Sequence, residues 1–111
     1  MPKSFDEESL KRELELTHDD VVELISDFRN YLVPALETIE KSMASGDFKT
    51  CRTAAHTLKG SAGNLRINAI HVSAKAVQEA ADAANAARLK ELLEQIKKEV
   101  AEFMQETANF S

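Results

Sequence analysis

The sequence predicts an all-α protein, an up-down antiparallel four-helix bundle with a short additional N-terminal helix. Three glycines and two prolines among 111 residues are too few for the turns of a β-sandwich or barrel. Apolar residues recur every three or four positions in several segments, which is the period of an amphipathic helix. Connections of two to four residues make neighbouring helices antiparallel. We expect residues 1–111 to form one domain with its core within about 17–104, because each of two domains would be too small for a good core.

A charged stretch at the N-terminus predicts the short additional helix. It spans about Ser4–Leu16 and should lie on the bundle rather than inside it. Its apolar points of contact are Phe5, Leu10 and Leu14.

The next helix should run from about His18 to about Ser45. Thr17 and Asp20 form a capping box before it, with a hydroxyl at the N-cap and a carboxylate three residues later. Pro34 lies inside this segment, yet the apolar stripe keeps its phase across it, so we expect a kinked continuous helix rather than two helices. The stripe consists of Val21, Ile25, Phe28, Leu32, Leu36, Ile39 and Met43.

Gly46 and Asp47 mark the clearest boundary, since glycine suits the left-handed end of one helix and aspartate the N-cap of the next. Three helices should follow, over about Phe48–Leu65, Asn68–Ala84 and Ala87–Phe103. The helix predicted from Asn68 carries a stripe of small residues for close packing: Ala69, Val72, Ala76, Ala80 and Ala83. The last helix has the most regular apolar pattern: Leu89, Leu92, Leu93, Ile96, Val100 and Phe103.

Composition narrows the classes of function. Against 14 Lys and Arg stand 19 Asp and Glu, a net charge of −5, whereas a general nucleic-acid binder needs excess cations to replace counterions. The single cysteine, Cys51, excludes an internal disulfide and a multi-thiolate metal site, and it fits a reducing compartment. No apolar run approaches the roughly 20 residues of a membrane span, and the N-terminus lacks a signal-peptide stretch. We therefore expect a cytoplasmic protein that binds neither nucleic acid nor membrane.

The helix predicted over about Phe48–Leu65 has two distinct faces on a helical wheel, with about 100° per residue. The face expected to be buried holds Cys51, Ala54, Ala55, Leu58, Ala62, Leu65 and Ala69. The opposite, solvent-facing stripe holds Lys49, Arg52, His56, Lys59, Gly60 and Gly63.

His56 is thus expected to be exposed in mid-helix among cations. A neutral imidazole is a nucleophile and titrates near neutral pH. Lys59, one turn later, can offset the charge of a phosphoryl group on that ring. Two glycines inside a helix cost about 1 kcal/mol each relative to alanine, and close approach of another surface to His56 would compensate for that cost.

The segment AAHTLKGSAGNL, residues 54–65, resembles the signature of histidine-containing phosphotransfer (HPt) domains, and the resemblance covers roughly Thr17 to Met104. It implies a four-helix bundle whose exposed histidine, His56, carries a phosphoryl group between receiver domains of response regulators. Lys59 matches the nearby cation, and Gly60 matches the small residue that leaves room for the phosphoryl group and the receiver. The supporting positions of the motif are matched by Leu58, Ser61 and Ala62.

The chain departs from this pattern at two turns. Arg66 stands where the family often has a glycine, and Ala-Asn-Ala around Asn85 replaces a frequent Gly-Asp before the last helix. Neither position touches the phosphoryl chemistry. Arg66, with Ile67, is a candidate for partner choice.

The resemblance also implies how the chemistry is divided. Nε2 of His56 attacks the phospho-aspartate of a receiver domain in line, and the reverse step passes the phosphoryl group to a second receiver. The chain itself would need no cofactor or metal, because the partner receiver supplies Mg²⁺. Expected partners are receiver domains and a hybrid sensor histidine kinase. Met1 and the closing residues favour a free-standing protein, and the family implies a monomer.

Several residues have plainer interpretations. Lys49 and Arg52 are either docking contacts or surface charges. Gly63 either clears the docking face or eases helix packing or fraying. His18 is expected at the surface, His71 in a structural role and Cys51 in the core. The three histidines are not spaced as a metal site.

Three other functions stay open. The bundle could dock receiver or kinase domains without accepting phosphate, as an adaptor. It could be the phospho-accepting domain of a chemotaxis-type kinase, or a structural protein that oligomerises through an apolar stripe. It is not expected to be an autonomous enzyme, since it has no glycine-rich phosphate loop for ATP.

Overall fold

The computed structural model describes residues 5–111, which form five α-helices and no strand. They are α1 (Glu7–Leu14), α2 (His18–Ser45), α3 (Phe48–Asn64), α4 (Asn68–Asp82) and α5 (Ala86–Glu106). The predicted second helix has the bounds of α2, and the predicted starts of α3 and α4 are those observed. The remaining predicted bounds differ by one to three residues.

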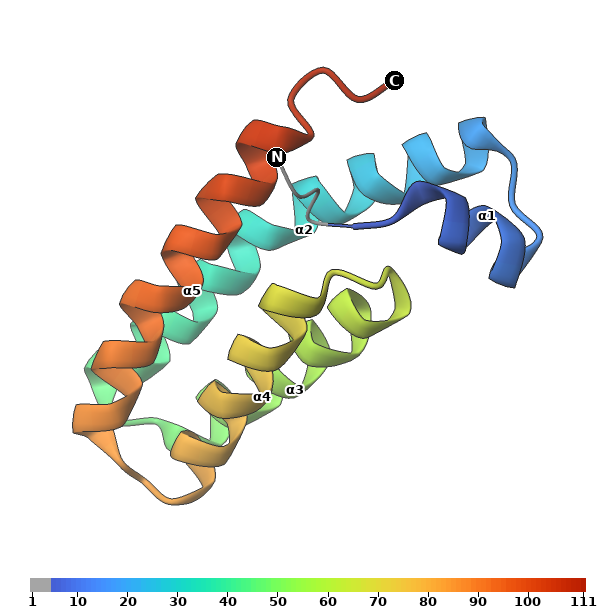
Figure 1. Cartoon of the computed structure of the whole chain (residues 1–111). Helices are drawn as coiled ribbons and strands as arrows, with labels where there is room; N and C mark the ends of the chain where they lie inside the picture. Colours follow the sequence, from blue (N-terminus) through green and yellow to red (C-terminus); the bar gives the residue numbers. More distant parts are fainter. Residues whose placement is uncertain (1–4) are drawn as a thin grey trace.

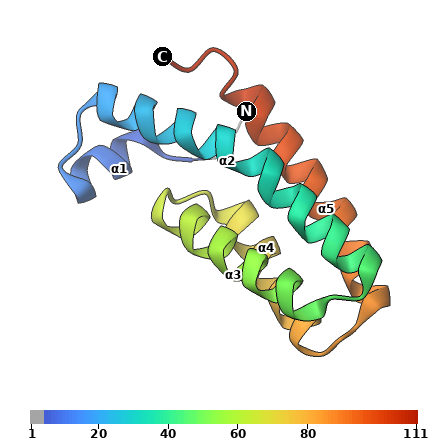
Figure 2. The same ribbon diagram turned by 180° about the vertical axis from the view of Figure 1, so that it is seen from behind.

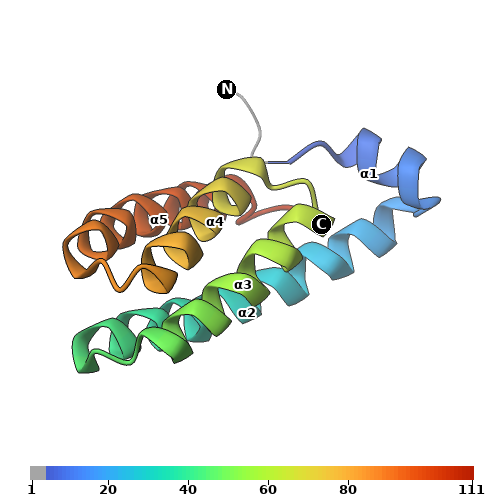
Figure 3. The same ribbon diagram turned by 90° about the horizontal axis from the view of Figure 1, so that it is seen from below.

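Helices α2 to α5 form the predicted up-down antiparallel bundle (Figure 1). Each packs on the next along the chain, and α2 closes the bundle against α5. Helices α3 and α4 make the most extensive contact, whereas no Cα atoms of α3 and α5 lie within 8 Å of each other. The α2–α3 pair and the α4–α5 pair lie as two layers when the bundle is seen from below (Figure 3).

The short helix α1 lies beside the first turns of α2, at the end of the bundle where α3 turns into α4 (Figure 2). Phe5 and Leu10 are buried as predicted. Leu14 is 44% exposed, so its prediction as a packing contact is wrong. The expected start at Ser4 lies outside the described residues.

Local chemistry fixes the ends of α2. Thr17 and Asp20 form the predicted capping box, in which the Thr17 Oγ1 accepts from the Asp20 N–H and the Asp20 carboxylate accepts from the Thr17 N–H. Gly46 ends the helix in the left-handed conformation, with φ of 73°. Pro34 lies within the continuous helix, as predicted.

The core contains the predicted apolar stripes of α2 and α5 and that of α3, except for Ala69, which is exposed. Of the small-residue stripe predicted for α4, Ala80 is buried and Ala76 packs against the core, but the other three members are wrong. Ala69 and Ala83 are exposed, and Val72 is 63% exposed. Alanine contributes little to a hydrophobic pattern, so the sequence of an alanine-rich helix does not determine which of its faces is buried. The buried residues of α4 are Ile70, Ser73, Ala74, Val77, Ala80 and Ala81.

The two turns that depart from the family pattern both contain a residue with positive φ. Arg66 has φ of 59° and Ala84 has φ of 51°, the region in which glycine is the usual residue. The Arg66 guanidinium donates to the main-chain oxygens of Gly63 and Asn64 and forms a 2.8 Å ion pair with Glu13 of α1. Arg66 therefore ties α1 to the α3–α4 turn instead of supplying the freedom of glycine.

Candidate functional site

His56 lies in the middle of α3 with its side chain exposed to solvent. Its helical neighbours Ala55 and Leu58 are fully buried, and they fix the opposite face of α3 in the core. Within residues 5–111, His56 makes no hydrogen bond or ion pair. The ring is therefore free to react with a group that approaches from solvent.

The other two histidines are both engaged within the molecule. His71 of α4 is partly buried and donates from Nδ1 to the main-chain oxygen of Lys59, at 2.9 Å, which confirms its structural role. His18 is at the surface, as predicted, but its two ring nitrogens lie 2.5 Å from the Glu7 carboxylate and 2.9 Å from the main-chain oxygen of Ser111. Those contacts raise the pKa of His18, with the bond to Glu7 as the largest cause.

The predicted cations differ in their surroundings. Lys49 is exposed and Lys59 is partly buried, and neither forms an ion pair with a residue in the described part of the chain. Arg52 is exposed, but its Nε lies 3.2 Å from Oδ1 of Asp82 at the end of α4. The guanidinium thus has an intramolecular partner that the sequence pattern did not reveal.

The two glycines of the predicted docking stripe have different environments. A Cβ added at Gly60 would meet nothing within 4 Å, so the surface there is open beside His56. A Cβ at Gly63 would lie 2.9 Å from Nδ1 of His71. The packing alternative for Gly63 thus has a structural basis, because the position leaves room for the His71 ring.

Comparison with known protein families supports the resemblance found in the motif. The family model for the Hpt domain matches residues 23–106, a range that contains α3, α4 and α5 in full and most of α2. The chain belongs to the Hpt domain family. Domains of this family are phosphocarrier modules that take part in histidine phosphotransfer and interact with receiver domains and kinases of two-component systems. Searches of curated proteins and of solved structures gave no significant match.

Two shallow hollows follow the seam between α2 and α3 of this Hpt domain. One, of about 540 Å³, is lined by Thr53 and Thr57, which precede and follow His56 on the α2 side of the ring. The other, of about 290 Å³, is lined by Tyr31 of α2 and Asn64 of α3 among other residues. The first hollow reaches the turn that carries His56, and the second begins with Ser61, five residues later on α3.

Sequence reasoning missed the contribution of α4 to the surroundings of the site. Asp82 pairs with Arg52, and the side-chain oxygen Oε1 of Gln78 is buried without a hydrogen-bond partner in residues 5–111. No local motif predicts a role for these residues, because their position relative to α3 depends on the register between the two helices. A charged or amide side chain in an otherwise alanine-rich helix is the signal that could have drawn attention to them.

Two residues singled out from the sequence lie away from any docking surface. Ile67 is 1% exposed and cannot contact a partner, so its candidacy for partner choice is wrong. Cys51 is fully buried, as predicted, and burial raises the pKa of its thiol.

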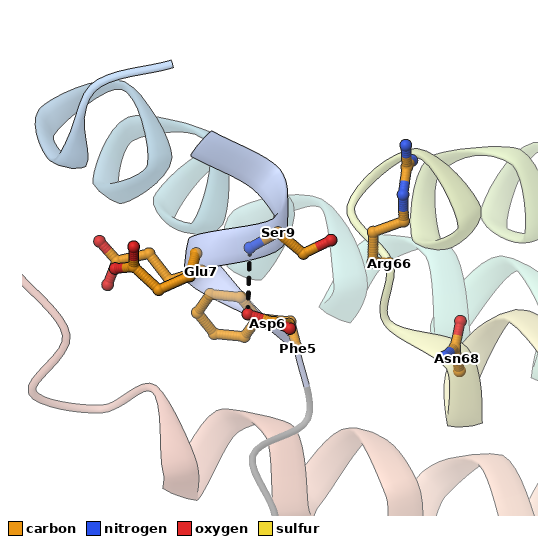
Figure 4. A pocket seen from close by; sticks show the side chains of 7 residues that line it. Phe5, Asp6, Glu7, Ser9, Arg66 and Asn68 are labelled. Atoms are coloured by element: carbon orange, nitrogen blue, oxygen red, sulfur yellow. Dashed lines mark hydrogen bonds between the residues drawn. The ribbon is translucent and has the colours of Figure 1, made fainter. Parts of the chain in front are cut away.

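A pocket of about 550 Å³ lies at the end of the Hpt bundle, between the start of α1 and the α3–α4 turn (Figure 4). Phe5, Asp6 and Ser9 line one side, and Arg66 and Asn68 face them from the other. Arg66, the candidate for partner choice, lines this pocket, whereas His56 and the residues predicted around it do not. In residues 5–111 no group of three or more His, Cys, Asp or Glu side chains could hold a metal ion, and no helix is long and apolar enough to cross a membrane.

Proposed function

We propose that this Hpt domain is the phosphocarrier of a multistep phosphorelay, in which His56 accepts a phosphoryl group from one receiver domain and delivers it to another. The observation that carries the proposal is that His56 is exposed and makes no hydrogen bond or ion pair in the described chain, while His18 and His71 are both engaged. A carrier needs a nucleophile that two partners can reach in turn.

In the proposed step, Nε2 of His56 attacks the phosphorus of a receiver phospho-aspartate. The new N–P bond forms as the bond from phosphorus to the carboxylate oxygen breaks, and the aspartate leaves as a carboxylate. The return step reverses these changes with a second receiver. Mg²⁺ belongs to the receiver and neutralises charge on the phosphoryl oxygens there.

The residues of this chain position the ring and its charge. Ala55 and Leu58 anchor α3, Lys59 offsets the negative charge on phospho-His56, and Gly60 admits the receiver surface. Lys49 and the Arg52–Asp82 pair form the rim of the docking face. We place the protein in the cytoplasm as a monomer, with receiver domains and a hybrid sensor histidine kinase as partners.

The proposal is tested by incubating the protein with a phosphorylated receiver domain and Mg²⁺, beside a His56→Gln variant. We expect acid-labile, alkali-stable label on the wild type and none on the variant. His56→Gln should fold normally because the side chain is exposed. No label from any of a panel of receivers that bind the folded protein would sink the carrier function and favour the adaptor.

A receiver and a histidine-kinase domain offered separately distinguish the relay from the chemotaxis-type arrangement. Label that comes from the receiver supports the relay. Label that comes only from an ATP-dependent kinase domain would contradict it.

A further inference from the structure

One face of α4 runs alongside the His56 turn of α3. Four residues recur on it at intervals of four, three and four positions, which places them on one side of a helix: His71, Lys75, Gln78 and Asp82. Both ends of this row touch α3. His71 donates to the main-chain oxygen of Lys59, and Asp82 pairs with Arg52.

The antiparallel register then places Lys75 and Gln78 at the level of His56. On α3, His56 stands between Arg52 and Lys59, four residues after one and three before the other. On α4, Lys75 and Gln78 stand between His71, the partner of Lys59, and Asp82, the partner of Arg52. Figures 1 and 2 both show α3 and α4 side by side along this length.

Lys75 has the properties of an available charge. Its side chain is exposed, and it forms no ion pair with any residue in the range 5–111, Glu79 one turn later included. Packed helix axes lie about 8–10 Å apart, a separation that the four-carbon stem of a lysine can largely bridge. The Arg52 guanidinium, by contrast, is held by Asp82.

We propose that Lys75 is a second cation of the phosphorylation site, placed by α4 to contact the phosphoryl oxygens on His56 from the side opposite the α2–α3 seam. This inference rests on the proposed function, since it names a further residue for the same chemistry. A phosphoryl group carries close to two negative charges at neutral pH. Lys59 from α3 and Lys75 from α4 then supply one positive charge each from two helices.

The experiment uses phosphoramidate, a small donor that needs no receiver domain. Nε2 of His56 attacks its phosphorus, the P–N bond of the donor breaks, and the amine takes a proton and leaves as ammonia. We compare wild type with Lys75→Gln and Lys75→Arg. Lys90→Gln on α5 is the matched control, because Lys90 is exposed, has no ion pair in the described chain and lies on a helix that has no Cα atom within 8 Å of one in α3.

At low salt, Lys75→Gln should slow phosphorylation of His56 about threefold, the size expected for an exposed charge pair, and Lys75→Arg should restore most of the rate. In about 1 M salt the difference should vanish, because the Debye length falls to about 3 Å. Lys90→Gln should match wild type under both conditions.

Three results would overturn the inference. They are equal rates for Lys75→Gln and Lys90→Gln, a slower rate that persists in high salt, and a wild-type His56 that phosphoramidate does not modify. Failure of the proposed function looks different. In that case His56 still reacts with phosphoramidate and responds to Lys75, but no receiver domain donates to it.

Discussion

Two histidine–glycine pairs, one within α3 and one between α3 and α4, have opposite surroundings. His56 and Gly60 face solvent, and a Cβ added at Gly60 would meet nothing within 4 Å. One turn later Gly63 faces the His71 ring of α4, which is tied to the main chain of Lys59. The first pair leaves a surface open for another molecule, and the second pair holds two helices together. What lies opposite a residue decides its role, and that is set by the packing of helices distant in sequence.

The largest expected effect comes from filling the open position. Gly60→Leu should lower phosphotransfer from a receiver about 100-fold, because displacement of reacting groups by roughly 1 Å can cost that much. Its fold should be unaffected, since Gly60 is exposed and a Cβ added there would meet nothing within 4 Å. Transfer rates are measured by quenched-flow labelling, with circular dichroism as the control. A wild-type rate for Gly60→Leu would break the distinction between the two glycines.

Alanine at the two glycines should give stability changes of opposite sign. Gly60→Ala should raise the free energy of unfolding by about 0.5–1 kcal/mol through helix propensity alone. Gly63→Ala should lower it by about 1–2 kcal/mol, since the new Cβ pushes the His71 ring off its hydrogen bond to Lys59.

Urea denaturation measures both changes. A Gly63→Ala/His71→Ala double variant sharpens the test, because removing the ring should remove the penalty at residue 63. Stabilisation by Gly63→Ala as large as that by Gly60→Ala would contradict the packing role of Gly63.

Sequence reasoning captured what depends on local chemistry and strong periodicity. The capping box at Thr17, the helix stop at Gly46 and the bounds of α2 all follow from neighbouring residues. The exposure of His56 follows from the contrast between its stripe and the apolar face of α3.

The rest depended on tertiary packing. The alanine-rich α4 gave no clear phase, so its inward face was misassigned and its row of residues beside His56 was missed. The partners Arg52–Asp82 and Arg66–Glu13 join residues 30 and 53 positions apart, which no local pattern can pair. The sequence pattern assigns Gly63 to a face of α3, but it cannot predict that the His71 ring lies opposite that face.

Ala84 is the converse of these glycines, a side chain where glycine would fit better. Its φ of 51° costs a non-glycine residue roughly 1 kcal/mol. Ala84→Gly should therefore raise the free energy of unfolding by about 0.5 kcal/mol, after allowance for the greater freedom of glycine in the unfolded chain. The midpoint in urea reports the change. Destabilisation would show that the Ala84 methyl makes a contact worth more than the strain.

The smallest effect concerns His18, the third histidine. Its pKa is raised chiefly by the hydrogen bond to Glu7 and next by that to the main chain of Ser111, so the folded state holds this proton more tightly than the unfolded chain. The stabilisation is full below the ordinary histidine pKa of 6.5 and is lost as pH rises through the higher pKa of the folded state.

Histidine changes charge between about pH 6 and about pH 8.5. The difference between the melting temperatures at these two pH values should therefore be smaller in His18→Gln than in the wild type. Phosphotransfer through His56 should be unchanged in this variant. An unaltered pH dependence of the melting temperature in His18→Gln would contradict a stabilising role for protonated His18.

The most direct test asks which histidine carries the phosphoryl group. The protein is labelled with ¹⁵N in its imidazoles and phosphorylated by a receiver domain, and phosphorus–nitrogen coupling is then read by NMR. Our account predicts coupling to Nε2 of His56 and to no nitrogen of His18 or His71. Coupling to either of those rings, or a phosphorylated protein with no coupled imidazole, would contradict it.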